Sequence, residues 1–245
     1  MAAKIVYVVT GTNRGIGLGL VTELVKRKDA LVFATARNPD KADALHALAK
    51  EHDNLEIVKL ETTSEAESQA AAALVKEKAG RVDYLIANAG VANLIAPILD
   101  TPVQKLREHF EVNTVGTQLT FQAFAPLLFA SPSPHFVVIS TTVGSIGMKL
   151  PLAMTAYGAS KAALNFLTAQ VAVEHGDQNN LAAYAISPGL VGTDMGNQAV
   201  AHFGMAEAPV KLEESVAGVL GIVDKATRES TGGRFRDYTG DELQW

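Results

Sequence analysis

The stretch IVYVVTGTNRGIG, residues 5–17, decides the fold of this 245-residue chain. Residues 5–9 are β-branched or aromatic without a break, which is typical of a strand buried on both faces of a parallel sheet. The glycines that follow are spaced G-x-x-x-G-x-G, and helical periodicity begins at Leu18. A strand, a glycine turn and a helix in that order can hold the diphosphate of a dinucleotide, because the turn admits a close backbone approach and the helix N-terminus offers free N–H groups. A plain tight turn is the alternative. The candidate cofactor-binding residues of the turn are Gly11, Thr12, Asn13, Arg14, Gly15, Ile16 and Gly17.

The rest of the chain repeats this alternation of strand and helix. Further strands are expected at residues 30–36, 55–60, 82–87, 136–140, 181–187 and 234–238. Helices are expected at residues 18–28, 39–51, 64–79, 103–129, 155–175 and 212–227. The pattern predicts an α/β fold, a Rossmann-type doubly wound three-layer sandwich with a central, mostly parallel seven-stranded sheet. With no repeat or linker, residues 1–245 are expected to form a single domain.

Composition narrows the functional classes. The net charge is −5 and no basic cluster is present, so we expect neither nucleic acid nor a membrane surface as a partner. The chain has no cysteine, which removes disulfides and thiolate metal sites, and we expect no bound metal. Residues 1–4 lead directly into the first strand, so no signal peptide is expected. No apolar run is long enough to cross a bilayer, and we expect a soluble, cytoplasmic protein.

The end of the second expected strand bears on the choice of dinucleotide. NAD sites commonly place an acidic residue there to bind the ribose hydroxyls, but this strand ends in Ala36-Arg37-Asn38. Asp40 follows a proline and is better placed to cap the next helix. Arg37 can bind a 2′-phosphate through two N–H groups, and Arg14 adds a second positive charge. These residues favour NADP(H), with two solvated arginines as the alternative.

Tyr157 and Lys161 form the candidate catalytic pair. Residues four apart lie on the same face of a helix, which places an ammonium near a phenol whose ordinary pKa is about 10. The positive charge is expected to lower the pKa of that phenol towards the working range of a general acid or base. The alternative is a half-buried tyrosine beside a solvated lysine.

Five motifs occur in order along the chain. They are Thr10-Gly11-x-x-x-Gly15-Ile16-Gly17, Asn88-Ala89-Gly90, Asn113, Tyr157-x-x-x-Lys161 and Pro188-Gly189-x-Val191-x-Thr193. In these motifs the chain resembles the short-chain dehydrogenase/reductase family over essentially its whole length. Residues 14–17, 144–147 and 240–245 further resemble fungal ketoreductases of the norsolorinic acid ketoreductase, sniffer and C-factor type.

The resemblance implies a role for each motif. Tyr157 would donate a proton to the substrate oxygen, and Lys161 would lower the pKa of the phenol and bind the nicotinamide ribose. Asn113 would hold a water that links Lys161 to solvent. The remaining motif residues would line the cofactor cleft or hold the nicotinamide carboxamide; they are Asn88, Ala89, Gly90, Pro188, Gly189, Val191 and Thr193.

The chain departs from the family pattern at two places. Where the family commonly has two consecutive serines, residues 140–142 read Ser-Thr-Thr. Neighbouring strand residues point to opposite faces, so Ser140 and Thr141 cannot both face the substrate. We favour Thr141 for the catalytic hydroxyl, with Ser140 as the alternative and Thr142 as a third option. The second departure is Glu61, before the adenine-contacting Thr62, where an aspartate is common.

The loops expected to cover the nicotinamide are apolar and rich in methionine. A bulky hydrophobic carbonyl compound would suit such a surface, although the same residues could simply pack beneath the loops. His202 is interpreted as a surface or packing residue. The loop residues are Met148, Leu150, Leu152, Met154, Met195, His202, Phe203 and Met205.

These observations favour an NADPH-dependent carbonyl reductase acting on a small-molecule ketone or aldehyde. An alcohol dehydrogenase working in the oxidative direction and a non-catalytic dinucleotide sensor on the same fold are the alternatives. The resemblance also implies a homodimer or homotetramer. An outward apolar stripe of the expected helix 155–175 would suit this association, although a core-facing stripe looks the same in sequence; it comprises Ala162, Ala163, Phe166, Leu167 and Gln170.

Overall fold

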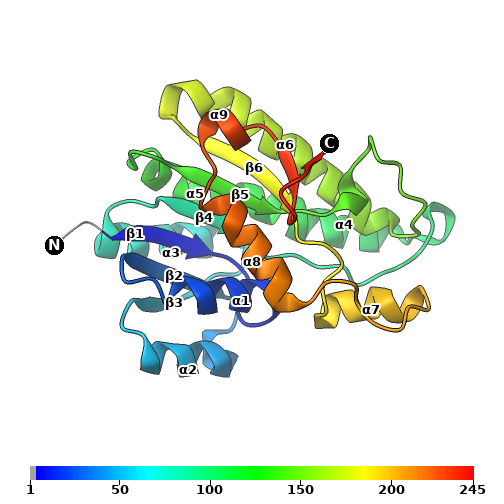
Figure 1. Cartoon of the computed structure of the whole chain (residues 1–245), viewed down its shortest axis with the longest axis horizontal. Helices are drawn as coiled ribbons and strands as arrows, with labels where there is room; N and C mark the ends of the chain where they lie inside the picture. Colours follow the sequence, from blue (N-terminus) through cyan, green and yellow to red (C-terminus); the bar gives the residue numbers. More distant parts are fainter. Residues whose placement is uncertain (1–3) are drawn as a thin grey trace.

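The computed structural model describes residues 4–245, and a single sheet runs through it (Figure 1). The sheet has eight strands in the order β3-β2-β1-β4-β5-β6-β7-β8. All neighbouring strands are parallel except β7 and β8, which pair antiparallel. The strands are β1 (Ile5–Val9), β2 (Ala30–Ala36), β3 (Leu55–Lys59), β4 (Tyr84–Ala87), β5 (His135–Ile139), β6 (Ala182–Ser187), β7 (Phe235–Asp237) and β8 (Glu242–Leu243).

Helices cover both faces of the sheet and complete the three layers. In Figure 1, α1 and α8 cross in front of the strands, and α3 and α5 lie behind them. The helices are α1 (Gly15–Leu24), α2 (Asp43–Glu51), α3 (Glu65–Ala79), α4 (Val103–Phe110), α5 (Gly116–Leu128), α6 (Thr155–Asn179), α7 (Asp194–His202), α8 (Leu212–Val223) and α9 (Arg228–Thr231).

The alternation of side chains in β1 explains why both faces can be covered. Val6 and Val8 belong to the core under α3, α5 and α6, whereas Tyr7 and Val9 belong to the core under α1, α2 and α8. Such strands need apolar residues at every position, which is why they read as unbroken hydrophobic runs. Strand order reverses between β1 and β4, and ligands of doubly wound sheets bind where such a reversal opens a crevice at the carboxyl ends of the strands.

The predicted α/β fold is confirmed, and the strand count of seven was wrong. The eighth strand, β8, is only two residues long and is held by backbone pairing with β7, so it leaves no hydrophobic run in the sequence. The expected helix 103–129 is divided by a π-helical turn at Glu111–Val115. The first helix begins inside the glycine turn, at Gly15, and not at Leu18. Helices α7 and α9 were not predicted.

The expectations about export and membranes meet the structure only in part. Residues 1–3, on which the signal-peptide expectation partly rests, lie outside the described residues. Within residues 4–245, no helix combines the length and apolarity needed to cross a bilayer.

Candidate active site

A cavity of about 780 Å³ lies at the carboxyl ends of the strands and collects most of the predicted site residues. Thr12, Gly17 and Asn113 are the predicted residues that do not line it. The predicted residues that do are Gly11, Asn13, Arg14, Gly15, Ile16, Arg37, Glu61, Thr62, Asn88, Ala89, Gly90, Ser140, Thr141, Tyr157, Lys161, Pro188, Gly189, Val191 and Thr193.

The glycine turn is shaped by its own contacts with the sheet. Gly11 and Gly15 have positive φ angles of 68° and 57°, which residues other than glycine rarely adopt. A Cβ on Gly17 would collide with the Gly11 carbonyl. The Thr12 hydroxyl donates to the Thr35 carbonyl at 3.0 Å. Thr12 and Gly17 therefore shape the turn and do not face the cavity, contrary to their predicted place among the cofactor contacts.

Asn88 braces the same turn from the neighbouring strand. Its side-chain N–H groups donate to the carbonyls of Thr10 and Gly11 at 2.9 and 3.0 Å. The Thr10 hydroxyl in return accepts the N–H groups of Asn88 and Ala89. The ends of β1 and β4 are thus fixed to each other beside the cavity.

The N-terminus of α1 opens onto the cavity without a capping group. Arg14 at the N-cap makes no side-chain capping bond, and the first turn contains no acidic residue. The first N–H groups of a helix have no partner inside it, and the helix dipole is positive at this end. Arg14, Gly15 and Ile16 line the cavity, so this end presents a donor set that fits a diphosphate.

Positive side chains gather at the end of the cavity beyond β2. Arg14 Nη1 lies 2.7 Å from Asp194 Oδ2, and Arg37 Nε lies 3.5 Å from Glu61 Oε2. Lys41 also lines the cavity and was not predicted. The turn Pro39–Lys41 folds the chain back after β2, which carries Lys41 to the same end as Arg37. In the sequence, the signal for Lys41 was its place only four residues after Arg37, the predicted phosphate-binding residue.

Lys161 and Tyr157 are positioned by α6 at the centre of the cavity. The Lys161 side chain is buried, and its Nζ donates to the Ile139 carbonyl at 2.8 Å. Burial lowers the pKa of Lys161 to about 8. Burial raises the pKa of Tyr157 to about 12, and a hydrogen bond with the Thr141 side chain acts in the opposite direction. The expected lowering of the Tyr157 pKa by Lys161 is therefore not found in the protein alone, where burial raises the pKa and Thr141 is the group that opposes this shift.

Asn113 lies in the π-helical turn and links two walls of the site. Its Oδ1 accepts the Val91 N–H at 2.7 Å, and its Nδ2 donates to the Val91 carbonyl and to Ser160 Oγ, each at 2.9 Å. Ser160 Oγ donates in turn to the Tyr157 carbonyl. The side chain of Asn113 is thus bonded to protein groups on both sides. π turns inside α-helices are often found at functional sites.

The hydroxyls of Ser140 and Thr141 point in different directions. Ser140 is buried and its Oγ donates to Asn165 Oδ1 at 2.5 Å. Thr141 Oγ1 accepts the Val143 N–H at 3.2 Å, and its side chain lies close enough to Tyr157 to lower the pKa of the phenol. The geometry therefore disagrees with Ser140 as the source of the catalytic hydroxyl and places that of Thr141 next to the phenol.

The segment after β6 leads from the cavity into α7. Gly189 has a φ angle of 81°, and the Pro188 carbonyl accepts the Ser215 hydroxyl at 2.7 Å. Val191 forms a β-bridge with Val210. Thr193 caps α7, because its Oγ1 accepts the Gly196 N–H at 3.2 Å. This cap helps to explain why α7 forms, although Gly196 and Asn197 in its first turn have low helix propensity and no helix was predicted here.

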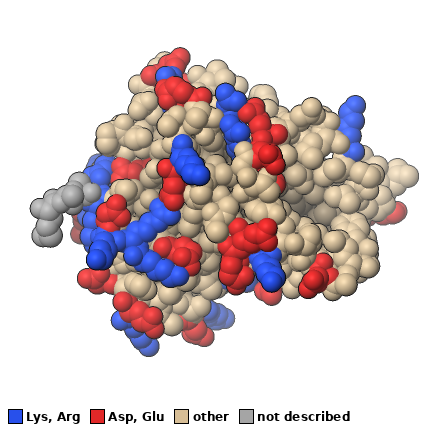
Figure 2. Space-filling model, in the orientation of Figure 1, with Lys and Arg blue, Asp and Glu red and all other residues tan. Residues whose placement is uncertain are grey.

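Four of the apolar loop residues expected at the mouth do line the cavity. They are Leu152, Met154, Met195 and Phe203. Charged residues of both signs are scattered over the left of the face in Figure 2, whereas the right of it, towards α7, carries few. The remaining loop residues expected at the mouth lie elsewhere: Met148, Leu150 and His202 do not line the cavity, and Met205 lines a second hollow.

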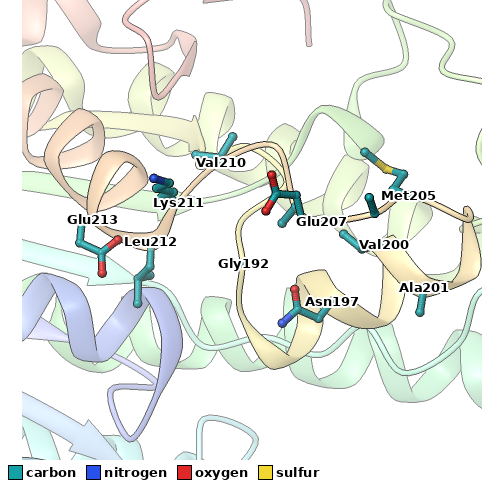
Figure 3. A pocket seen from close by; sticks show the side chains of 12 residues that line it. Gly192, Asn197, Val200, Ala201, Met205, Glu207, Val210, Lys211, Leu212 and Glu213 are labelled. Carbon is teal, nitrogen blue, oxygen red and sulfur yellow. The ribbon is translucent and has the colours of Figure 1, made fainter.

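That second hollow, of about 710 Å³, lies between α7 and the segment leading to α8 (Figure 3). It shares Gly192 and Leu212 with the larger cavity. Val200 and Met205 line it together with the polar side chains of Asn197 and Glu207. None of the predicted catalytic residues lies there.

Comparisons with known proteins find relatives over nearly the whole chain. A family model described as short chain dehydrogenase matches residues 5–203. Norsolorinic acid ketoreductase of Aspergillus parasiticus is 37% identical, over 98% of this chain and 91% of its own. The structure of NADPH-bound carbonyl reductase from chicken fatty liver is 34% identical, with a TM-score of 0.89 over 99% of this chain and 100% of that chain. Carbonyl reductase Sniffer of D. melanogaster is 28% identical, with a TM-score of 0.89 and the same coverage.

Proposed function

Because the chain belongs to the short-chain dehydrogenase/reductase family, we propose that it is an NADPH-dependent carbonyl reductase with Tyr157 as the proton donor. The observation that carries the proposal is the meeting of Tyr157, Lys161 and Thr141 at the cavity that the glycine turn also lines. Two similar structures are described as carbonyl reductases, one of them bound to NADPH.

The residues of the cavity fit NADP(H). The uncapped N-terminus of α1 would hold the diphosphate, and Arg14, Arg37 and Lys41 would hold the 2′-phosphate. Lys161 would bind the nicotinamide ribose, and Val191 and Thr193 would hold the carboxamide. When bound, the cofactor supplies the hydride. Three positive side chains at one end of the cavity support NADP(H) over NAD.

Tyr157 carries the proton that reduction of a carbonyl group requires. A phenol with a pKa of about 12 keeps its proton at neutral pH, so Tyr157 is ready to donate it to a carbonyl oxygen. The Thr141 hydroxyl favours the phenolate that donation leaves behind.

An apolar carbonyl compound is the substrate that the mouth of the cavity supports. Leu152, Met154, Met195 and Phe203 offer hydrophobic contact, and methionine side chains adapt to different shapes. A dinucleotide sensor would have no need of the arrangement of Tyr157 and Thr141. The second hollow contains none of these groups, so we assign the reaction to the larger cavity.

The expected homo-oligomer is part of the same proposal. Phe166 and Val173 on α6 are 68% and 77% exposed, which suits burial against a second copy. The measured mass in solution, from light scattering, would test this. A monomer at all concentrations would contradict it.

The test of function is NADPH consumption against aliphatic, aryl and polycyclic ketones, with NADH in parallel. Wild type should reduce at least one ketone and should prefer NADPH. Tyr157→Phe should bind NADPH and lose this activity. Full activity of that variant would contradict the proposal, and NADPH binding with no turnover of any carbonyl compound would favour the sensor.

A further inference from the structure

Two segments outside the cavity, which served in the sequence only as marks of resemblance, meet in the structure. Ser145 Oγ donates to the Gln244 carbonyl at 2.6 Å. The Gly147 N–H donates to the Trp245 carbonyl at 2.8 Å. The segments are nearly a hundred residues apart in the sequence, yet they bind each other through backbone and hydroxyl groups.

The C-terminal segment is anchored to the sheet, so its two carbonyls are fixed. β8 pairs with β7 through its backbone, whereas the ion pair between Glu242 and Arg234 is about half exposed and contributes little to this anchoring. The Trp245 ring stacks on the fully buried ring of Phe235, with centroids 5.5 Å apart and planes at 22°. Stacked aromatic pairs of this kind add stability beyond their buried area.

The loop at the other side of this contact fits closely against it. A Cβ on Gly147 would lie 2.8 Å from Gln244 Oε1 and 2.9 Å from Gln244 Cβ, so a larger residue would be displaced. Ser145 is buried, and its Oγ also accepts the Met148 N–H at 3.1 Å. One hydroxyl thus closes the loop upon itself and ties it to the C-terminal segment.

The same loop continues directly into the turn that carries Thr141. The 3-10 turn Thr142–Gly144 starts at Thr141, whose side chain caps it by accepting the Val143 N–H. Gly144 rests on α6, where an added Cβ would lie 2.8 Å from Lys161 Cβ, and its carbonyl accepts from Asn165. Movement of residues 145–147 would therefore move the hydroxyl that faces Tyr157.

We propose that Ser145, Gln244 and Trp245 form a clamp that positions the Thr141 turn for catalysis. Ser145 is a positioning residue, because it lines no part of the cavity and acts through the turn. The catalytic part of this proposal rests on the proposed function of Thr141 and Tyr157.

The test compares Ser145→Ala and Trp245→Ala with two matched controls. Trp245→Phe keeps the stacking on Phe235, and Glu242→Gln removes the ion pair of the same hairpin without touching the loop. Each protein is assayed for kcat, KM and NADPH affinity, and by hydrogen–deuterium exchange over residues 142–148.

Both alanine variants should exchange faster at residues 142–148 and lose about tenfold or more in kcat, because the donor to the phenolate is misplaced. NADPH affinity should change by less than about twofold, and both controls should behave like wild type. Unchanged exchange or unchanged kcat in Ser145→Ala would overturn the clamp. A parallel loss of NADPH affinity would overturn it too, because it would indicate a general loosening of the site.

The exchange measurement separates this proposal from the proposed function. If wild type reduces no carbonyl compound, the proposed function fails, and faster exchange in the alanine variants still supports a clamp that orders the turn. Unchanged exchange overturns the clamp whatever the activity of the enzyme.

Discussion

Ionisable side chains are buried at both ends of the sheet, and the large cavity opens at one of them. At the carboxyl ends of the strands lie Tyr157 and Lys161, facing the large cavity. At the amino ends, Tyr7, Tyr84 and His135 stack across β1, β4 and β5, with ring centroids 4.8 and 4.4 Å apart.

Burial shifts pKa values at both ends. At the amino ends it raises the pKa of Tyr7 to about 12 and lowers the pKa of His135 to about 4. It also holds the pKa of Tyr184 well above its ordinary value. The shifts of Tyr7 and His135 match those of Tyr157 and Lys161 in cause and size. A shifted pKa alone therefore does not locate an active site in this fold.

Polar bonds occur at the amino ends too, where the Tyr7 hydroxyl accepts from Arg27 and Asp83 accepts from Ser131, but two buried polar atoms there have no partner among the described residues. The Tyr184 hydroxyl and His135 Nδ1 are buried with no hydrogen-bond partner among residues 4–245. At the other end Lys161 is bonded to the Ile139 carbonyl and Asn113 is bonded to Ser160. The comparison teaches that a bonded polar network opening on a cavity marks the site, and that desolvation only accompanies it.

The largest expected effect is the difference in kcat between two variants that each lose one tyrosine hydroxyl, one at either end of the sheet. Tyr157→Phe should lower kcat by about 10³-fold, because the proton donor is lost. Tyr184→Phe should leave kcat unchanged and should keep or raise stability by up to about 1 kcal/mol, because its hydroxyl is buried without a partner. Steady-state kinetics and urea unfolding of both variants measure this contrast. A comparable loss of kcat in Tyr184→Phe would break the comparison.

A second pair of variants probes the carboxyl ends alone. Thr141→Val should lower kcat by about 10²-fold, because it removes the hydroxyl beside the developing phenolate. Thr141→Ser should retain most of the activity. Ser140→Ala should keep kcat within about threefold and lose about 1–2 kcal/mol of stability, since Asn165 is left without its donor. The opposite ranking of Thr141→Val and Ser140→Ala would return the catalytic role to Ser140.

His135, at the amino ends of the strands, should make the stability of the folded protein depend on pH in the acid range. Its pKa is about 4 in the folded protein and about 6.5 in the unfolded chain, so the unfolded state binds more protons between these values. Stability is therefore fully present above about pH 6.5 and is lost as the pH falls towards 4, by about 2 kcal/mol between pH 7 and 5. His135→Phe should remove about that much of the pH dependence of unfolding. An unchanged slope would show that other groups control acid stability.

Much of the fold followed from local sequence patterns. Strands buried on both faces need apolar residues at nearly every position, and a strand is present at each of the seven expected places. β8 was not predicted, because two residues that pair through their backbone show no side-chain pattern in the sequence. α7 was not predicted, because it depends on the Thr193 cap and on tertiary contacts more than on the helix propensity of its residues.

The site divides in the same way. The glycine turn and the pair Tyr157 and Lys161 are short-range patterns, so their spacing was visible in the sequence, and their order along the chain with the other motifs carried the prediction. The direction of the Thr141 hydroxyl and the partners of Asn113 depend on neighbours that are distant in sequence. The pKa of Tyr157 depends on how deeply the whole fold buries it, which spacing does not express.

The smallest expected effect separates two arginine–aspartate pairs, one at each end of the sheet. Arg14 and Asp194 are about 70% exposed, whereas Arg27 is 28% exposed and binds Asp224 through two contacts of 2.7 and 3.0 Å. If Arg14 binds the 2′-phosphate, Asp194 competes for it. Asp194→Asn should then tighten NADPH binding by about two- to fivefold, within the range of an exposed ion pair, and leave NADH binding and stability unchanged.

Asp224→Asn is the matched control for that variant. It should lower stability by up to about 1 kcal/mol and leave both cofactors unaffected, because Arg27 pairs with Asp224 far from the cavity. Titration calorimetry at low and high salt measures both variants, and the gain in Asp194→Asn should shrink as salt screens the charges. Equal tightening of NADPH and NADH would mean that Asp194 acts through its general charge. Arg14 would then lose its assignment to the 2′-phosphate, and Arg37 and Lys41 would remain as its binding residues.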